Sequence, residues 1–144
     1  MKVGLITLMS AFLLLLPLAA TAGNSECQLD NTDTDGDGVC DLIDNCVDVA
    51  NASPIDCDTD QDGYGNLCDG DFDNAGSPRV SSGDFSNRWF LDFGAGTDSG
   101  VGTNMSCDGS PAVSAGDFDL WFTQFGLGSP GPSGLACAGT VPCP

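Results

Sequence analysis

One spacing of carboxylate residues occurs twice between Asp33 and Asp69, and it constrains the fold more than any other feature of the chain. The first copy reads D-T-D-G-D-G-V-C-D-L-I-D, and the second reads D-T-D-Q-D-G-Y-G-N-L-C-D. Each copy places oxygen-bearing side chains at positions 1, 3, 5, 9 and 12, a glycine at position 6 and a backbone carbonyl at position 7. Such spacing winds a loop around a hard cation with about six to eight oxygen ligands, and the glycine permits the sharp turn. The predicted calcium ligands are Asp33, Asp35, Asp37, Val39, Asp41 and Asp44 in the first copy, and Asp58, Asp60, Asp62, Tyr64, Asn66 and Asp69 in the second.

The first residues of the chain have the layout of a secretory signal peptide. Lys2 supplies a positive charge, residues 5–18 are apolar, and Ala20-Thr21-Ala22 provides small residues at a cleavage site before Gly23. The apolar stretch is short for a membrane anchor and ends in this small-residue motif, so we interpret residues 1–22 as a leader that is removed. We therefore expect a secreted, extracellular protein with no membrane span after the leader.

Acidic residues dominate the charge: the chain has 21 Asp and Glu, three Lys and Arg, and no His, for a net charge of −18. Removal of the leader removes Lys2 and changes the net charge to −19, with Arg79 and Arg88 as the remaining cationic residues. Nucleic acid is excluded as a partner because its recognition requires basic residues. Without His, the chain lacks imidazole catalysis and the usual imidazole ligands of zinc. The carboxylates stand at ligand spacing without an accompanying base or nucleophile, so we predict that the protein is not an enzyme.

Eight cysteines lie in the part of the chain that we expect to be exported. An even number in an oxidising compartment predicts disulfides rather than thiolate metal ligands. Few large apolar residues precede Phe72, so residues 23–73 cannot build an ordinary hydrophobic core. The acidic stretch also lacks helical and strand periodicity, and it should therefore consist of irregular loops that depend on cations and crosslinks.

The stretch D-T-D-G-D-G-V-C-D-L-I-D-N-C-V-D-V-A-N from Asp33, followed by the second acidic copy from Asp58, resembles a pair of thrombospondin type 3 repeats. The shared motifs include D-N-C at Asp44-Asn45-Cys46 and the closing C-D at Cys68-Asp69. The resemblance implies an irregular chain wrapped around several calcium ions, with almost no regular secondary structure. It also implies a disulfide between Cys46 and Cys68. One departure is Gln61, which stands where a glycine or another small residue is usual.

The remaining cysteine pairings follow less directly. Cys40 and Cys57 are additional to the repeat motif. Cys40 has two candidate partners, Cys27 and Cys57, of which we favour Cys27. The tail of the chain contributes a further expected pair, Cys137 and Cys143.

The second half of the chain contains an internal duplication. The segment G-S-P-R-V-S-S-G-D-F at 76–85 recurs as G-S-P-A-V-S-A-G-D-F at 109–118, and each copy runs into an aromatic stretch. In the second copy the aromatic side chains stand at i, i+3, i+4 and i+7, which is one face of a short helix. Gly94 and Gly126 stand where a C-terminal glycine would end the helix of each copy.

These two copies resemble a dockerin, in which a calcium loop followed by a short helix occurs twice. In that register Asp84 and Asp117 take the last ligand position of each loop, although Pro78 and Pro111 replace the glycine at the turn. Asp84 and Asp117 have a second interpretation as N-caps of the aromatic helices. The candidate ligands here are Asp71, Asp73 and Asp84, together with Asp69, in the first copy, and Asp108 and Asp117 in the second.

The aromatic stripes also have two interpretations. A structural role would place Phe85, Trp89, Phe93, Phe118, Trp121 and Phe125 in one small core between the copies. A binding role would leave part of the stripes exposed as a docking patch for a partner protein. We expect the core, because no other segment supplies enough large apolar side chains to form one.

Taken together, these patterns predict mostly irregular, calcium-wrapped, disulfide-crosslinked loops with little regular secondary structure, followed by a small α-helical, duplicated, dockerin-like half. The expected organisation is a signal peptide at 1–22, a thrombospondin type 3-like calcium-binding region at 23–73, a duplicated loop-helix region at 74–128 and a Pro- and Gly-rich tail at 129–144.

The predicted function is that of a secreted, non-catalytic, calcium-binding structural or adhesive spacer. The dockerin resemblance implies that the second half binds a cohesin-like or other extracellular protein, and it favours a bacterial source. An alternative is a self-assembling matrix, surface or filament subunit that is held together by calcium and aromatic contacts.

Overall fold

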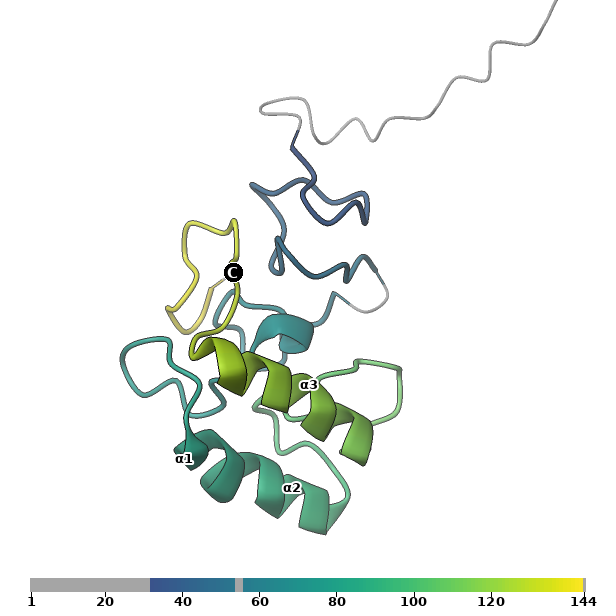
Figure 1. Ribbon diagram of the computed structural model, residues 1–144, viewed down its shortest axis with the longest axis vertical. Coiled ribbons are helices and arrows are strands. Elements are labelled where there is room, and N and C mark those ends of the chain that lie inside the picture. The colour runs from purple at the N-terminus through teal and green to yellow at the C-terminus, as the bar shows by residue number, and fades with distance from the viewer. Residues whose placement is uncertain (1–31, 54–55, 144) are drawn as a thin grey trace, which may run out of the picture.

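The computed structural model describes residues 32–53 and 56–143. Within these ranges the backbone forms no β-strand, and its helical elements are η1 (Asn66–Cys68), α1 (Ser82–Asp84), η2 (Phe85–Trp89), α2 (Phe90–Ala95) and α3 (Ala115–Leu127). The first, η1, is a single 3-10 turn, and η2 is a π-helical turn that joins α1 and α2 into one continuous helix. The helices gather at one end of the molecule, and the acidic loops extend toward the other (Figure 1). The prediction of a loop-rich fold with little regular secondary structure is confirmed.

Disulfides crosslink these loops. Within the described residues they join Cys46 to Cys68, Cys57 to Cys107, and Cys137 to Cys143. The Cys57–Cys107 bond ties the acidic region to the duplicated region, and it makes the alternative pairing of Cys40 with Cys57 wrong. Cys40 is itself disulfide-bonded, and its favoured partner Cys27 lies outside the described residues.

The predicted signal peptide at residues 1–22 also lies outside the described residues. Among the helices that are described, none is both long and apolar enough to cross a membrane.

Each copy of the duplication begins its helix in the same way. Ser81 and Ser114 are the N-caps, and each serine hydroxyl accepts a hydrogen bond from the glycine amide two residues later. In return, the carboxylates of Asp84 and Asp117 accept hydrogen bonds from the backbone amides of these serines, at 2.7 and 2.8 Å. This reciprocal arrangement is a capping box, which satisfies amides that the first helical turn leaves unpaired. Asp84 and Asp117 therefore stand at the third helical position, and their interpretation as N-caps is wrong.

The helices end two residues later than predicted. Gly96 and Gly128 terminate α2 and α3 in the left-handed conformation, with φ of 74° and 82°. The amide of Gly128 donates to the Gln124 carbonyl at 2.9 Å, which satisfies one of the last carbonyls of the helix. Gly94 and Gly126 were predicted to end the helices, but both remain within helical turns because the chain has a second glycine that can take the positive φ.

A one-residue difference between the two helices is absorbed by η2. Trp89 follows Phe85 at i+4, whereas Trp121 follows Phe118 at i+3. In η2 the amide of Phe90 donates to the carbonyl of Phe85, five residues earlier, and this wider turn accommodates the extra residue. As a result both tryptophans reach the core.

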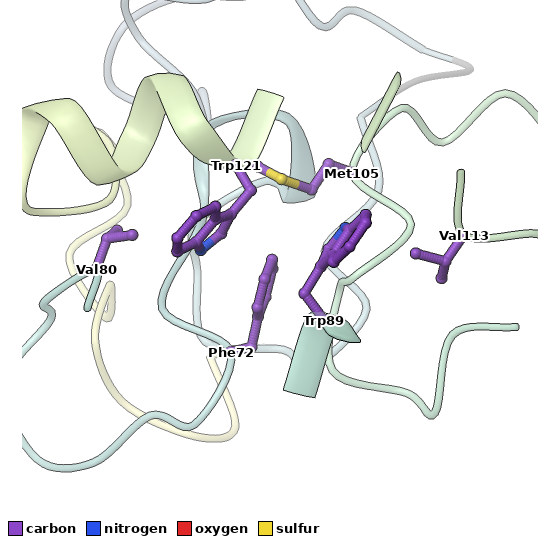
Figure 2. Close-up of a cluster of buried hydrophobic side chains, with 6 residues drawn as sticks. All are labelled: Phe72, Val80, Trp89, Met105, Val113 and Trp121. Atoms are coloured by element: carbon purple, nitrogen blue, oxygen red, sulfur yellow. The ribbon is translucent and has the colours of Figure 1, made fainter. Parts of the chain in front are cut away.

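The core lies between the two copies and draws on both of them. Its buried side chains are Phe72, Val80 and Trp89 from the first copy, and Met105, Val113 and Trp121 at the equivalent positions of the second. The two tryptophans and Phe72 occupy the centre, and the two valines lie on opposite sides of it (Figure 2). The duplication therefore builds a single core from paired positions.

The predicted core contained six aromatic residues, and the structure divides them. Trp89 and Trp121 are buried, and Phe85 and Phe118 pack against them while partly exposed. The prediction is wrong for Phe93 and Phe125, which are 44% and 41% exposed. Both residues lie in the last helical turn, beyond the core, where each stacks on the tryptophan one turn earlier, with ring centroids 4.9 and 5.0 Å apart.

Candidate metal centre

The first predicted loop, residues 33–44, gathers three carboxylates. Asp33, Asp35 and Asp37 each offer an oxygen, and these oxygens all lie within 4.8 Å of one another. Backbone amides orient the carboxylates: Gly38 donates to Asp33 at 3.1 Å and Val39 donates to Asp37 at 2.8 Å. The amide of Asn51, outside the loop, donates to the other oxygen of Asp37 at 2.8 Å. The local chain therefore sets most of the geometry of this loop-1 cluster, with one contact from a later segment.

The second predicted loop, residues 58–69, repeats this arrangement. Asp58, Asp60 and Asp62 form a loop-2 cluster within the same 4.8 Å limit. The amide of Gly63 donates to Asp58 at 2.9 Å, and that of Tyr64 donates to Asp62 at 2.8 Å. These are the same two hydrogen bonds as in loop 1, at the same positions.

The backbones of the two loops also match in conformation. At position 6, Gly38 and Gly63 have φ of 95° and 89°. At position 4, Gly36 has φ of 78° and Gln61 has φ of 61°. A positive φ is easy for glycine and costly for a residue with a side chain. Gln61, which departs from the repeat pattern, therefore adopts the loop conformation despite that cost.

A third cluster joins the acidic region to the helical region. Asp71, Asp73 and Asp84 bring their oxygens within 4.8 Å of one another. Asp84 comes from α1, and its Oδ1 accepts a hydrogen bond from the Asp73 amide at 3.3 Å, whereas its Oδ2 accepts the capping bond from Ser81. Asp69, which the sequence grouped with these residues, is buried and lies outside this tight cluster.

Residues at loop position 9 each form hydrogen bonds with the threonine at position 2 of the same loop. Asp41 accepts hydrogen bonds from the amide and hydroxyl of Thr34, at 2.8 and 2.7 Å. Asn66 likewise accepts from the Thr59 amide at 2.8 Å and donates to its hydroxyl at 2.8 Å. Asp41 is not one of the three tightly grouped carboxylates of loop 1, but its charge contributes to the raised pKa of Asp35 and Asp44, so it lies close to them. The ligand roles of Asp41 and Asn66 stay predictions.

Residues at loop position 12 are buried beside the clusters. Burial, together with the charges of Asp37 and Asp35, raises the pKa of Asp44 to about 6. Burial also raises the pKa of Asp69 well above its ordinary value, with a further contribution from Asp62. Both carboxylates thus face the negative charge of their own loop.

Loop 2 shows the same electrostatic strain inside its cluster. Burial, together with the charge of Asp62, raises the pKa of Asp60 to about 7. Burial raises the pKa of Asp62 to about 6, to which the charge of Asp58 contributes. Like charges that are partly removed from water repel one another strongly, and a bound cation would relieve that repulsion.

The residues present fit calcium. One oxygen of Asp35, Oδ2, is buried and accepts no hydrogen bond, which leaves it available to a cation. Each cluster supplies carboxylate oxygens, the ligands that a hard divalent ion prefers, and the chain contains no histidine. Calcium bound there would supply the positive charge that the clusters lack.

Within the described residues, the second copy of the duplication does not form an equivalent cluster. Asn104 and Ser106 stand where the first copy has Asp71 and Asp73. The Ser106 amide donates to Asp117 at 2.9 Å, and the Ser106 hydroxyl donates to the Asn104 side chain at 3.2 Å. Asp108 is exposed, and its carboxylate accepts a hydrogen bond from the Ser110 amide at 2.9 Å. In the part of the chain that the structure describes, Asp108 and Asp117 are not brought together.

Comparison with known proteins finds a family model that matches the acidic region. Residues 26–53 and 57–80 match the sequence model of the thrombospondin type 3 repeat family, as the resemblance predicted. Repeats of this family are extracellular structural repeats that bind calcium. The two matched segments contain the clusters of both loops, together with Asp71 and Asp73.

Searches of curated proteins and of solved structures returned no match. The resemblance of residues 74–128 to a dockerin stays a prediction.

Proposed function

We propose that this protein is a secreted, non-catalytic calcium-binding spacer whose helical half attaches it to another extracellular protein. The observation that carries the proposal is the pair of matching carboxylate clusters in loops 1 and 2, within segments that match a calcium-binding repeat. The third cluster extends the same chemistry to the start of α1. Under this proposal the ions serve as the interior of a region that has little apolar core of its own.

Repulsion between carboxylates opposes folding of the acidic region when no cation is bound. Two such groups about 5 Å apart repel by roughly 0.8 kcal/mol even in water, and by more when they are buried. Ion binding and folding of the acidic region are then a single equilibrium. A site with a dissociation constant of about 0.1 mM, in about 1 mM calcium, adds roughly 1.4 kcal/mol to stability. Three such sites together would decide whether this region is folded.

Exposed aromatic side chains support the attachment role of the helical half. Phe90 and Phe122 occupy equivalent positions and are 58% and 60% exposed. An apolar groove adjoins them, lined by Phe85, Trp89, Phe90, Phe93, Ala115 and Phe118. An aromatic surface of this kind is suited to a protein partner, which for a dockerin-like unit would be a cohesin-like domain.

The same surface favours a second candidate function, self-assembly into a matrix, surface or filament subunit. Its exposed aromatic residues would then bury against another copy of the chain. Size-exclusion chromatography with calcium distinguishes the two functions, because a spacer with a separate partner stays monomeric and a self-assembling subunit forms larger species.

Calorimetric titration of calcium, followed by circular dichroism, tests the main proposal. We expect at least two ions to bind, with a large ordering change, and the double variant Asp37→Ala with Asp62→Ala to lose most of both. A matched control is Asp48→Ala with Asp119→Ala, which removes the same charge from exposed residues outside the clusters. An unchanged titration in the first variant contradicts the ligand assignment.

A further inference from the structure

The segment after α3 returns to the acidic loops instead of leaving the molecule. Figure 1 shows this segment, residues 131–143, running beside both loops. The segment donates five hydrogen bonds to the loops. To loop 2, the amide of Gly131 donates to the carbonyl of Cys68 at 3.0 Å, the hydroxyl of Ser133 to Gly63 at 2.6 Å, the amide of Gly139 to Asp62 at 2.8 Å, and the amide of Cys143 to Gln61 at 2.6 Å. To loop 1, the amide of Gly134 donates to the carbonyl of Asp44 at 2.8 Å. Every acceptor is a backbone carbonyl of loop 1 or loop 2.

These contacts depend on the folded path of the loops. The carbonyls of Gln61 and Gly63 belong to residues with positive φ, so their directions are set by the same conformation that gathers the loop-2 carboxylates. The Asp44 carbonyl belongs to the last position of loop 1. The segment therefore binds a backbone shape that exists only when both loops are wound.

Backbone approaches backbone closely at these contacts. A Cβ atom on Gly134 would overlap the carbonyl oxygen of Asp41 in loop 1. A Cβ atom on Gly63 would lie 2.6 Å from the Cys143 sulfur, and one on Gly131 would lie 2.8 Å from the Tyr64 ring. Glycine at these positions is what allows the segment to lie against the loops.

Few other contacts hold the segment in place: the Pro132 carbonyl accepts a hydrogen bond from the Val47 amide at 2.9 Å, just after loop 1. Of residues 131–143, only Cys143 is buried, and Leu135 and Val141 do not enter the core. The Cys137–Cys143 disulfide closes the end of the segment on itself, together with local hydrogen bonds such as Ala138 amide to Leu135 carbonyl at 3.0 Å. A segment with few apolar contacts opens locally when its hydrogen-bond partners change shape.

We propose that residues 131–143 form a calcium-responsive strap that docks across both acidic loops when they hold cations and detaches as a unit when the cations leave. This inference rests on the proposed calcium binding. Docking of the strap and binding of ions are coupled, and the coupling is reciprocal: ions strengthen docking, and the docked strap strengthens ion binding. Detachment would expose residues 131–143 and the loop carbonyls to partners and proteases.

Hydrogen exchange measured by mass spectrometry on the purified chain tests the strap directly. With saturating calcium, the amides of Gly131, Gly134, Gly139 and Cys143 are expected to exchange about tenfold or more slowly than after chelation. Calorimetry on the same sample separates the two hypotheses. If ions bind but strap exchange does not change, the strap proposal is overturned and the calcium function stands. If no ions bind, both proposals are overturned.

A steric variant tests the reciprocal coupling without touching a carboxylate. Gly134→Ala should displace the strap, give fast strap exchange even with calcium, and weaken calcium binding between about 5- and 150-fold. Gly126→Ala is the control, because a Cβ atom there meets nothing within 4 Å, and it should leave both properties unchanged. Fluorescence of Trp89 and Trp121 verifies that the helical core stays folded. Wild-type calcium affinity in a Gly134→Ala protein with a displaced strap overturns the coupling.

Discussion

Asp84 and Asp117 make the same capping contacts with the serine that begins their helix, yet only Asp84 lies in a carboxylate cluster among the described residues. The Asp84 oxygen lies within 4.8 Å of oxygens of Asp71 and Asp73. At Asp117 the equivalent neighbours are an amide and a hydroxyl side chain, which carry no charge. Both aspartates therefore cap a helix, but only Asp84 also stands where it could help to hold a cation.

This difference gives a matched pair of variants. Asp84→Asn and Asp117→Asn should each weaken a capping box, at a cost of about 0.5–2 kcal/mol. Only Asp84→Asn should also lower the number of calcium ions bound, by one, because it removes a ligand charge from the third cluster. Titration calorimetry measures the ion number. The same ion number in both variants would argue against a third site.

Position 4 of the two loops gives a second pair. Gln61→Gly should stabilise the protein by up to about 1 kcal/mol, because it removes the cost of a side chain at positive φ. Gly36→Ala introduces that cost at the equivalent position of loop 1 and should destabilise by about 1 kcal/mol or more, although a Cβ atom there meets nothing within 4 Å. Thermal unfolding with calcium measures both effects. Destabilisation by Gln61→Gly would mean that the side chain makes a contact worth more than the strain.

The π-helical turn gives a third prediction. Deletion of Asn87, an exposed residue of η2, should convert the turn to regular α-helix and leave Trp89 in the core, at the i+3 spacing of the second copy. Deletion of Asp119 in α3 is the control: it should turn Trp121 away from the core and cost about 3–5 kcal/mol, as for loss of a buried tryptophan. Chemical denaturation and tryptophan fluorescence report both outcomes. Equal damage from the two deletions would refute the proposed equivalence of the helices.

The raised carboxylate pKa values predict an unusual pH dependence without calcium. Because burial raises the pKa of Asp60 to about 7 and that of Asp62 to about 6, the folded state binds more protons than the unfolded state between about pH 4 and 7. Folding stability in calcium-free buffer should therefore increase as the pH falls from about 7.5 to 5.

With calcium the dependence should reverse. Protons compete with the ion for the same oxygens, so calcium affinity should decrease over the same pH range. Thermal unfolding at several pH values, with and without calcium, checks both trends, and the two curves should converge at acidic pH. A calcium-free protein that loses stability steadily from pH 7.5 to 5 would contradict this interpretation of the clusters.

Much of the acidic region could be predicted because its geometry is local. Most of the hydrogen bonds that orient Asp33, Asp35 and Asp37 come from amides two to five residues away, so their spacing indicates the cluster, although Asp37 also accepts one from the Asn51 amide. The ligand pattern does not reveal that Asp41 and Asn66 also hydrogen-bond to a threonine of their own loop.

The remaining features depend on contacts that leave little pattern in the sequence. The Cys57–Cys107 pairing joins two regions, and cysteine spacing does not determine such a connection. The strap binds mainly through backbone amides, which every residue but proline carries, so its sequence gives little indication of these contacts. Phe93 is exposed because its turn of the helix lies beyond the core. The spacing of aromatic residues along a helix does not show which turns contact the core.

The claim on which the account depends is that cations occupy the carboxylate clusters and hold the acidic loops together. A crystal structure of the purified chain grown with calcium, with ion positions located by anomalous scattering, tests it most directly. We predict one ion in each of the three clusters, coordinated by Asp33, Asp35 and Asp37, by Asp58, Asp60 and Asp62, and by Asp71, Asp73 and Asp84. Clusters that contain only water at saturating calcium, in loops that keep the same fold, would contradict it.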